Sequence, residues 1–470
     1  MPDAVANPWR LRAGWALFFG LLLLVVLAQA WRADGRALHA DESVQWDLAR
    51  RAAEGEAYGR SDDKFHGPAL SVVVRAAAVL TGTDFGEMSP GFLRSVPHAF
   101  LVLLSFAPLA LTGAGLRERM LAALTCLLVG GALPYARYFV QETLLVCAVG
   151  WSCVLWMRAE ASGWRRPPLA LCGVAAGFAL ACKVTAAAQL GFLVASVLLL
   201  RRQGPGWRGL LLLGLSATLS WIFFQTSCLS DPGGLMAWGA QFLRSFGVAT
   251  GGEDALEAPT LVPWLWCAGW LGLLTWLRWR VRPVAGLMGR HPGDPALLAS
   301  WCIFLLHLAL PYKTPWLLLA PLLLPLAALG PAMISGRFAF PAVTAFGFVL
   351  PFLVADNWRV VWSHTPTLTS QVAALEAGAA SQARVRGGNY FIAVSGGHYW
   401  PLPYYLRRHP VGYGDFPEAA RAPLRLIPAE DASRPVVPGY VTGRLQIREG
   451  EAFWVLVAKG DERHFSGLLR

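Results

Sequence analysis

Charged residues are scarce in this sequence, and their scarcity excludes most soluble classes of protein. Of 470 residues only 15% are charged, while 55% are hydrophobic and 21 are Trp. The mean hydropathy is +0.46, which is too apolar for a soluble globular domain. The composition therefore predicts a polytopic membrane protein.

Cysteine is sparse as well, and its placement indicates no disulfide framework. The eight Cys lie in or near apolar runs, apart from Cys228 at a helix end, and none follows Val354. No CxxC pair occurs in the sequence. Cysteine therefore gives no indication of the redox compartment.

Apolar runs long enough to cross a bilayer indicate about eleven transmembrane helices. Their starts lie near Gly14, Phe92, Met120, Phe139, Pro168, Thr185, Gly209, Pro263, Ala296, Pro315 and Phe338. No small-residue cleavage site follows the first run, so we expect a membrane anchor and not a removed signal peptide. We expect two domains: a membrane domain over residues 1–356 and a small α/β domain over residues 357–470.

Arginine is concentrated in the short loops of one side, which fixes the expected topology. With the N-terminus inside, Arg117, Arg158, Arg201 and Arg278 all fall on the inner side, as the positive-inside rule requires. The net charge of +11 is then a topogenic signal and needs no nucleic-acid partner. The first long loop, 31–90, and the tail fall on the outer side.

The expected outer parts contain several elements. In the tail, residues 368–380 indicate a helix, and residues 389–394 and 452–457 indicate buried strands. Residues 69–80 are apolar but short, which favours an interfacial or re-entrant segment. Residues 228–259 form a second long loop.

Two adjacent carboxylates, Asp41 and Glu42, lie in the first outer loop just after the first span. A carboxylate there is suited to act as a general base toward an acceptor hydroxyl, with its neighbour tuning it or binding substrate. The alternative is that Asp41 is the N-cap of a helix over residues 43–54. The spacing of apolar residues suggests that this helix is amphipathic and lies on the bilayer.

Lysine occupies four positions, although Lys and Arg together number 40. Lys183 and Lys313 both fall at tight outer connections between apolar runs, in ALACKVTA and ALPYKTPW. A compact ammonium there is suited to a phosphate held at headgroup level. The alternative is a lysine that extends to the interface.

Other ionisable and polar residues accompany these lysines at the outer ends of apolar runs, where such groups are functional candidates. In LPYARYFVQETLL, Arg137 could grip a phosphate in a bidentate manner while Glu142 orients it or contacts substrate. Pairing of the two with each other or with a headgroup is the alternative. His66, in KFHGPAL, is a candidate polar contact or metal ligand, and a structural histidine is an equal alternative.

The order of these motifs resembles the GT-C superfamily of integral-membrane glycosyltransferases. The resemblance is to the branch of bacterial protein O-mannosyltransferases and lipid A aminoarabinose transferases. It rests on HADESVQWDLA, on Tyr58 followed by FHGPAL, on PYARYFVQE, on ACKVTA, on YKTPWLLLAPLLLP and on SGGHYWPLPYYLRR in the tail. The motifs span most of the chain, and their order and sidedness carry the specificity.

The resemblance implies an inverting transferase that moves a hexose or pentose from a polyprenyl (undecaprenyl) phosphate carrier to a lipid, glycan or protein acceptor. It implies a multi-pass protein of the bacterial inner membrane whose active site and tail face the periplasm. Asp41 would be the general base, assisted by Glu42. The donor phosphate would contact Arg137, Lys183 and Lys313, and the substrate would contact Tyr58, His66, Tyr138 and Glu142. The motifs require no metal; the first loop lacks a DxD, although His39 and His66 leave a divalent metal possible.

Other function classes predict different sequences. A transporter or flippase of lipid-linked substrates predicts internal repeats and ionisable residues at mid-membrane. An O-antigen polymerase or ligase predicts a large loop between late spans. A noncatalytic assembly subunit is compatible with the same motifs.

The acidic pair gives a direct prediction. Asp41→Asn should abolish sugar transfer, because a carboxamide does not accept the acceptor proton, while membrane insertion and thermal stability stay nearly unchanged. The measurement is turnover of the purified variant beside its melting temperature. Near-normal turnover would show that Asp41 is not the general base.

Overall fold

The computed structural model describes residues 8–30, 37–56, 66–112, 115–200, 204–249, 262–281, 293–310, 315–333, 368–388, 390–396, 399–429, 433–448 and 451–469. The chain forms two compact units. The first comprises residues 1–33, 51–77 and 94–358, and the second comprises residues 34–50, 78–93 and 359–470.

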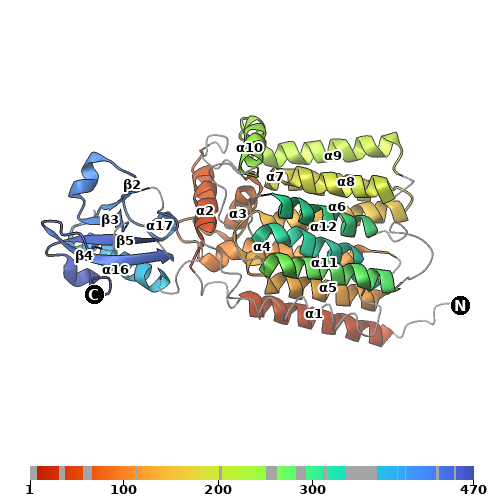
Figure 1. Cartoon of the computed structure of the whole chain (residues 1–470), viewed down its shortest axis with the longest axis horizontal. Coiled ribbons are helices and arrows are strands. Elements are labelled where there is room, and N and C mark those ends of the chain that lie inside the picture. The colour runs from red at the N-terminus through yellow and green to blue at the C-terminus, as the bar shows by residue number, and fades with distance from the viewer. Residues whose placement is uncertain are drawn as a thin grey trace. The chain divides into compact units, whose positions relative to one another are not determined.

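Apolar helices make up the first unit (Figure 1). They are α1 (Pro8–Ala30), α4 (Pro90–Ser105), α5 (Leu116–Ala132), α6 (Glu142–Ala161), α7 (Arg166–Cys182), α8 (Ala186–Leu200), α9 (Trp207–Gln225), α10 (Gly234–Ala249), α11 (Val262–Val281), α12 (Asp294–Ala309) and α13 (Leu319–Met333). Short 3₁₀ turns, η3 (Pro134–Arg137) and η4 (Pro315–Leu318), precede α6 and α13. Two further helices, α2 (Ala40–Ala53) and α3 (Ala69–Thr81), contain residues of both units, as does α4, whose first four residues belong to the second unit.

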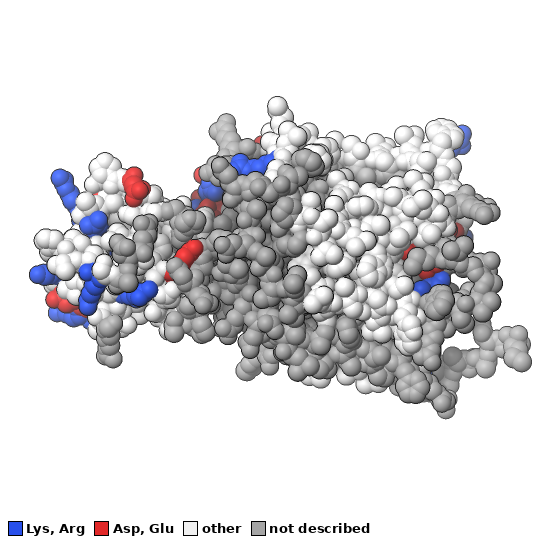
Figure 2. Space-filling view, viewed as in Figure 1, with Lys and Arg blue, Asp and Glu red and all other residues white. Residues whose placement is uncertain are grey.

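Many exposed side chains of the first unit are apolar, which is the surface that a bilayer requires. Leu24 of α1, Leu199 of α8 and Leu211 of α9 are all more than half exposed. On the face drawn in Figure 2, few described side chains over these helices are charged. Within the described residues, three helices are both long and apolar enough to cross a membrane: Pro90–Ala110, Glu142–Ala161 and Trp207–Gln225.

Most expected apolar segments are helical, but their number as spans stays a prediction. Helices lie at each expected position from α1 to α13, whereas the segment near Phe338 lies outside the described residues. Several of these helices are shorter than a full span. The expectation of a long loop over residues 228–259 is wrong in part, because α10 occupies residues 234–249.

A strip of small residues lets α7 and α9 pack with their backbones in close approach. A Cβ atom on Gly173 would lie 2.4 Å from the Leu213 carbonyl oxygen, and one on Gly177 would lie 2.1 Å from that of Ala217. The Ser220 hydroxyl donates to the Val174 carbonyl at 2.8 Å across the same contact. Such spacing of small residues is typical of helix pairs that associate within a membrane.

The second unit contains a five-stranded sheet of order β2-β1-β3-β5-β4. Its strands are β1 (Ile392–Val394), β2 (Val411–Tyr413), β3 (Leu424–Pro428), β4 (Tyr440–Arg448) and β5 (Glu451–Ala458). β1 pairs in parallel with β2 and β3, and β5 pairs antiparallel with β3 and β4. The helices α16 (Leu368–Val385) and α17 (Leu402–Tyr405) belong to the same unit.

The core of the second unit explains why the tail folds. Leu375 of α16 packs with Ile392, Leu426 and Val455 of three strands in one buried apolar cluster. β5 is buried along nearly its whole length, as its continuous apolar run predicts. The expected helix and the strand expected over residues 452–457 are therefore confirmed, and the helix extends five residues further, to Val385. Of the strand expected over residues 389–394, the last three residues form β1.

The α7–α9 contact gives a paired prediction. Gly177→Ala should lower the melting temperature, because its methyl group would overlap the Ala217 carbonyl unless the helices separate. Gly191→Ala in α8 is the matched control, since a Cβ atom there meets no atom within 4 Å and alanine favours a helix. Equal melting temperatures for the two variants would contradict close backbone packing.

Candidate functional site

The acidic pair lies in the first turn of α2, and the two carboxylates have different surroundings. Glu42 is buried, and its Oε2 accepts from the backbone N–H of His39 at 2.8 Å. The side chain of Asp41 is 43% exposed. Both acids favour the start of a helix, where the helix dipole is positive. Asp41 is thus the accessible carboxylate, and Glu42 is a structural support for the helix start.

His39, and not Asp41, caps α2. The helix begins at Ala40, and the Nδ1 atom of His39 accepts from the Asp41 backbone N–H at 3.2 Å. The Glu42 carboxylate in turn accepts from the His39 backbone N–H. The two side chains therefore form a reciprocal cap, in which each accepts from a backbone N–H at the start of the helix. The alternative that Asp41 is an N-cap is therefore wrong.

The expected amphipathic helix is present, but a position flat on the bilayer is wrong. Glu42, Ser43, Trp46 and Ala49 of α2 are each at most 1% exposed. A helix at a lipid surface would expose its polar residues to water. Protein covers α2 instead, so its acidic start is held by tertiary contacts.

The second unit, which contains the start of α2, also contains a cluster of aromatic side chains. Tyr399 lies with its ring centroid 4.7 Å from that of Tyr413 and 5.7 Å from that of Trp400. Burial raises the pKa of Tyr413, with added contributions from Tyr399 and Asp47. Its hydroxyl therefore stays protonated and can donate a hydrogen bond at neutral pH.

In the first unit, Lys183 and Glu142 form a buried ion pair. The Lys183 Nζ atom lies 2.6 Å from Glu142 Oε1, and the two side chains are 9% and 5% exposed. Glu142 is the first residue of α6, and Lys183 is the C-cap of α7. Each charge therefore complements the dipole of the helix that carries it. The sequence singled out both residues without indicating that they pair.

His66 lies beside this pair because its chain segment forms a bridge to Lys183. The two residues form an antiparallel bridge, and the Gly67 N–H donates to the Cys182 carbonyl at 2.9 Å. The backbones approach so closely that a Cβ atom on Gly67 would lie 1.9 Å from the Ala181 carbonyl oxygen. Glycine after His66 is thus a requirement of the contact.

Two glutamines hold the same turn. Gln141 donates from Nε2 to the Gly67 carbonyl at 2.8 Å and accepts from the Leu70 N–H at 3.2 Å. Gln241 of α10 donates to the His66 carbonyl at 2.8 Å. These amides satisfy backbone groups of a buried turn that water does not reach. Neither glutamine was among the site residues predicted from the sequence.

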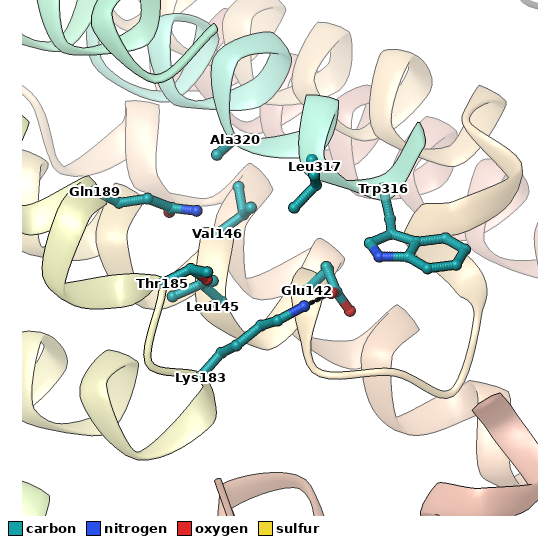
Figure 3. Close-up of a pocket in the computed structure, with 9 residues that line it drawn as sticks. All are labelled: Glu142, Leu145, Val146, Lys183, Thr185, Gln189, Trp316, Leu317 and Ala320. Atoms are coloured by element: carbon teal, nitrogen blue, oxygen red, sulfur yellow. Dashed lines mark hydrogen bonds and ion pairs between the residues drawn. The ribbon is translucent and has the colours of Figure 1, made fainter. Parts of the chain in front are cut away.

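The ion pair lines a hollow of about 230 Å³, which includes space open to solvent. Figure 3 shows the Lys183 ammonium and the Glu142 carboxylate joined across it, with the Trp316 ring beside Glu142 and Gln189 further along. Its lining is Glu142, Leu145, Val146, Lys183, Thr185, Gln189, Trp316, Leu317 and Ala320. An ion pair, an aromatic ring, two further polar side chains and four aliphatic residues thus line one hollow.

Of the remaining expected site residues, two are described by the structure and two are not. Arg137 ends η3 and is partly exposed, and the adjacent Tyr138 is buried. Both precede Glu142 at the start of α6, where the Thr143 hydroxyl donates to the Ala136 carbonyl at 2.8 Å. Tyr58 and Lys313 lie outside the described residues. No group of three or more His, Cys, Asp or Glu suited to a metal ion occurs among the residues that the structure describes.

With this geometry in view, comparison with solved structures shows the fold of ArnT, a protein of the GT-C superfamily that the sequence resembles. ArnT from Cupriavidus metallidurans bound to undecaprenyl phosphate aligns with a TM-score of 0.62, at 15% identity over 97% of this chain and 99% of that one. The apo state of the same protein gives 0.59, at 15% identity over 95% and 98%.

A more distant likeness is to the archaeal oligosaccharyltransferase AglB from Archaeoglobus fulgidus, with a TM-score of 0.46 at 11% identity over 86% of this chain and 65% of that one. No protein-family model matches the sequence, and no curated protein is detectably similar to it. At these identities the likeness establishes the fold, and the bacterial branch of the prediction is consistent with it.

The ion pair gives a prediction on stability. Lys183→Met should lower the free energy of unfolding by about 3–5 kcal/mol, because it leaves the Glu142 carboxylate buried without its cation. The double variant Lys183→Met/Glu142→Leu should recover most of that loss. Thermal unfolding in detergent measures both.

The control for these variants is Lys459→Met, whose side chain is exposed in the second unit and should have little effect. Single and double Lys183 variants that unfold at the same temperature would show that the two side chains are not coupled.

Proposed function

We propose that this protein is an inverting glycosyltransferase of the bacterial inner membrane. It transfers a hexose or pentose from a polyprenyl (undecaprenyl) phosphate carrier to a lipid, glycan or protein on the periplasmic side. About eleven spans, with the C-terminal domain in the periplasm, belong to the same proposal. The observation that carries it is the buried Lys183 ammonium, which faces a hollow in a chain with the fold of an undecaprenyl-phosphate-bound ArnT.

The first unit supplies the donor half of the reaction. A sugar phosphodiester has one negative charge, and a second develops on the phosphate as the bond from the anomeric carbon to oxygen breaks. Lys183 in a weakly polar hollow stabilises this developing charge more strongly than it would in water. In the free enzyme Glu142 neutralises the ammonium at 2.6 Å, so the donor phosphate competes with Glu142 for Lys183. Arg137 and Lys313 are the further proposed phosphate contacts, and Tyr58, His66 and Tyr138 the proposed substrate contacts.

The second unit supplies the acceptor half. Asp41 accepts the proton of the acceptor hydroxyl as the acceptor oxygen attacks the anomeric carbon from the side opposite the phosphate. One displacement of this kind inverts the anomeric configuration. The exposure of Asp41 supports this role, since an acceptor can reach its carboxylate. Glu42, whose carboxylate holds the backbone of His39, supports the position of the base.

Binding of undecaprenyl phosphate tests the donor half. Lys183→Met/Glu142→Leu should raise the Kd of this lipid about tenfold or more, because it removes a charge-assisted contact while keeping the buried site neutral. The measurement is native mass spectrometry of the purified protein titrated with undecaprenyl phosphate.

The matched control is Arg278→Met/Asp294→Leu. This removes another ion pair, with Arg278 Nε 2.7 Å from Asp294 Oδ1, whose residues do not line the hollow. Equal Kd values for the two double variants would show that Lys183 does not bind the phosphate.

Sugar transfer and lipid transport leave different products. A transferase adds a sugar to a cell-envelope lipid, glycan or protein, and that sugar disappears when the protein is removed. Mass spectrometry of envelope material with and without the protein therefore identifies donor sugar and acceptor together. An unchanged set of glycosylated products would favour a transporter or flippase.

A further inference from the structure

Residues 40–50 of α2 belong to the same compact unit as the C-terminal domain, although residues in contact, such as Ser43 and Pro401, are 358 positions apart in the sequence. The segment that joins them in space is Pro401–Arg407, which contains α17 and which we call the clamp segment. Its contacts lie on both sides of Asp41 in the sequence.

The first contact fixes the chain just before α2. The Tyr405 hydroxyl accepts from the backbone N–H of Leu38 at 2.9 Å. Leu38 is fully buried, and Ala37 is part of the apolar core that α16 and the sheet form. The chain is therefore held at the residue before His39, the cap of α2.

The second contact fixes the first turns of the helix. The Ser43 hydroxyl donates to the Pro401 carbonyl at 3.3 Å, and the ring of Trp46 meets that of Tyr404 edge to face at 5.2 Å. Ser43, Trp46 and Tyr404 are each at most 2% exposed. Asp41 thus lies between an anchor at Leu38 and an anchor at Ser43.

A third segment, residues 85–88, completes the arrangement. The Trp46 indole donates to the Phe85 carbonyl at 3.2 Å, and the Tyr404 hydroxyl donates to the Met88 carbonyl at 2.7 Å. Arg407 donates to the Gly86 carbonyl at 2.8 Å, with its guanidinium 4.1 Å from the centre of the Tyr404 ring. Specific hydrogen bonds therefore join two parts of the first loop to each other and to the C-terminal domain.

We propose that the C-terminal domain positions the catalytic base, with Tyr405 as a positioning residue that acts through the start of α2. This inference rests on the proposed role of Asp41. A general base works only within hydrogen-bond reach of the proton that it removes, and a displacement of about 1 Å can cost a hundredfold in rate. The clamp segment gives the exposed Asp41 a fixed backbone on both sides, at Leu38 and at Ser43.

The test compares two full-length variants that each lose one tyrosine hydroxyl. Tyr405→Phe removes the acceptor of the Leu38 N–H. Tyr440→Phe is the matched control, because its hydroxyl donates to the Ala422 carbonyl at 2.8 Å in the same domain but makes no recorded contact with α2. Hydrogen exchange of residues 37–46 and steady-state transfer kinetics are measured on both.

Tyr405→Phe should speed exchange at the start of α2 about tenfold, the effect of losing one hydrogen bond. It should lower kcat about tenfold and leave the donor KM unchanged, because the proposed donor contacts lie elsewhere in the chain. Tyr440→Phe should change neither quantity.

The outcomes separate this inference from the proposed function. Unchanged exchange in Tyr405→Phe would overturn the anchoring whatever the activity. Faster exchange with the kcat of Tyr440→Phe would overturn the positioning role. A wild-type protein that transfers no sugar would overturn the proposed function and the catalytic role of the anchor together, and the exchange data would still report the anchor itself.

Discussion

The ion pair between Lys183 and Glu142 is the interaction on which the arrangement of the first unit's site depends. A single buried charge is costly in an apolar environment, so each of these residues requires the other. This ion pair holds the start of α6 against the end of α7. Through the bridge to Lys183 it also fixes the turn that carries His66. The ion pair and the bridge beside it thus bring three segments that are distant in the sequence together.

A second buried ion pair, between Arg278 and Asp294, has a different geometry. Arg278 pairs with Asp294, the first residue of α12, through two hydrogen bonds of 2.7 and 3.1 Å. A guanidinium that donates to both oxygens of one carboxylate is held in a fixed orientation, which suits a structural link. The Lys183 ammonium, which donates to Glu142 Oε1 at 2.6 Å, is a compact point charge without a fixed planar geometry. An ammonium of this kind can exchange its partner more easily than a bidentate guanidinium, which is compatible with the proposed binding role of Lys183.

The sequence predicted the features that depend on local composition. Apolar runs predicted the positions of the helices, and the unbroken apolar run in β5 predicted a buried strand. Such predictions succeed because the burial of a segment depends on how apolar its own residues are. The small number of lysines pointed to Lys183, and the acids after the first run pointed to Asp41. The bounds of α10 were missed because its sequence lies between polar, glycine-rich stretches.

Pairings across long separations could not be predicted in the same way. Nothing in the residues near Lys183 indicates Glu142, 41 positions earlier, as its partner. Leu38 and Tyr405 are 367 positions apart, and the Leu38 contact uses a backbone N–H, which every residue except proline has. Gln141 and Gln241 likewise bind backbone carbonyls, so their type alone gave no signal. Such contacts are consequences of the whole fold.

The placement of Asp41 follows from the limits of a short polar helix. A helix of 14 residues is marginal in water by its own hydrogen bonds, and α2 contains five charged residues. Its stability must therefore come from packing of Trp46 and its neighbours against other parts of the unit. Membrane helices offer mainly apolar surface, whereas the C-terminal domain offers hydroxyls and carbonyls that satisfy polar groups near the helix start. To hold an exposed carboxylate on a rigid helix start, the chain needs polar partners for the backbone around it. The C-terminal domain provides them through Tyr405 and Pro401.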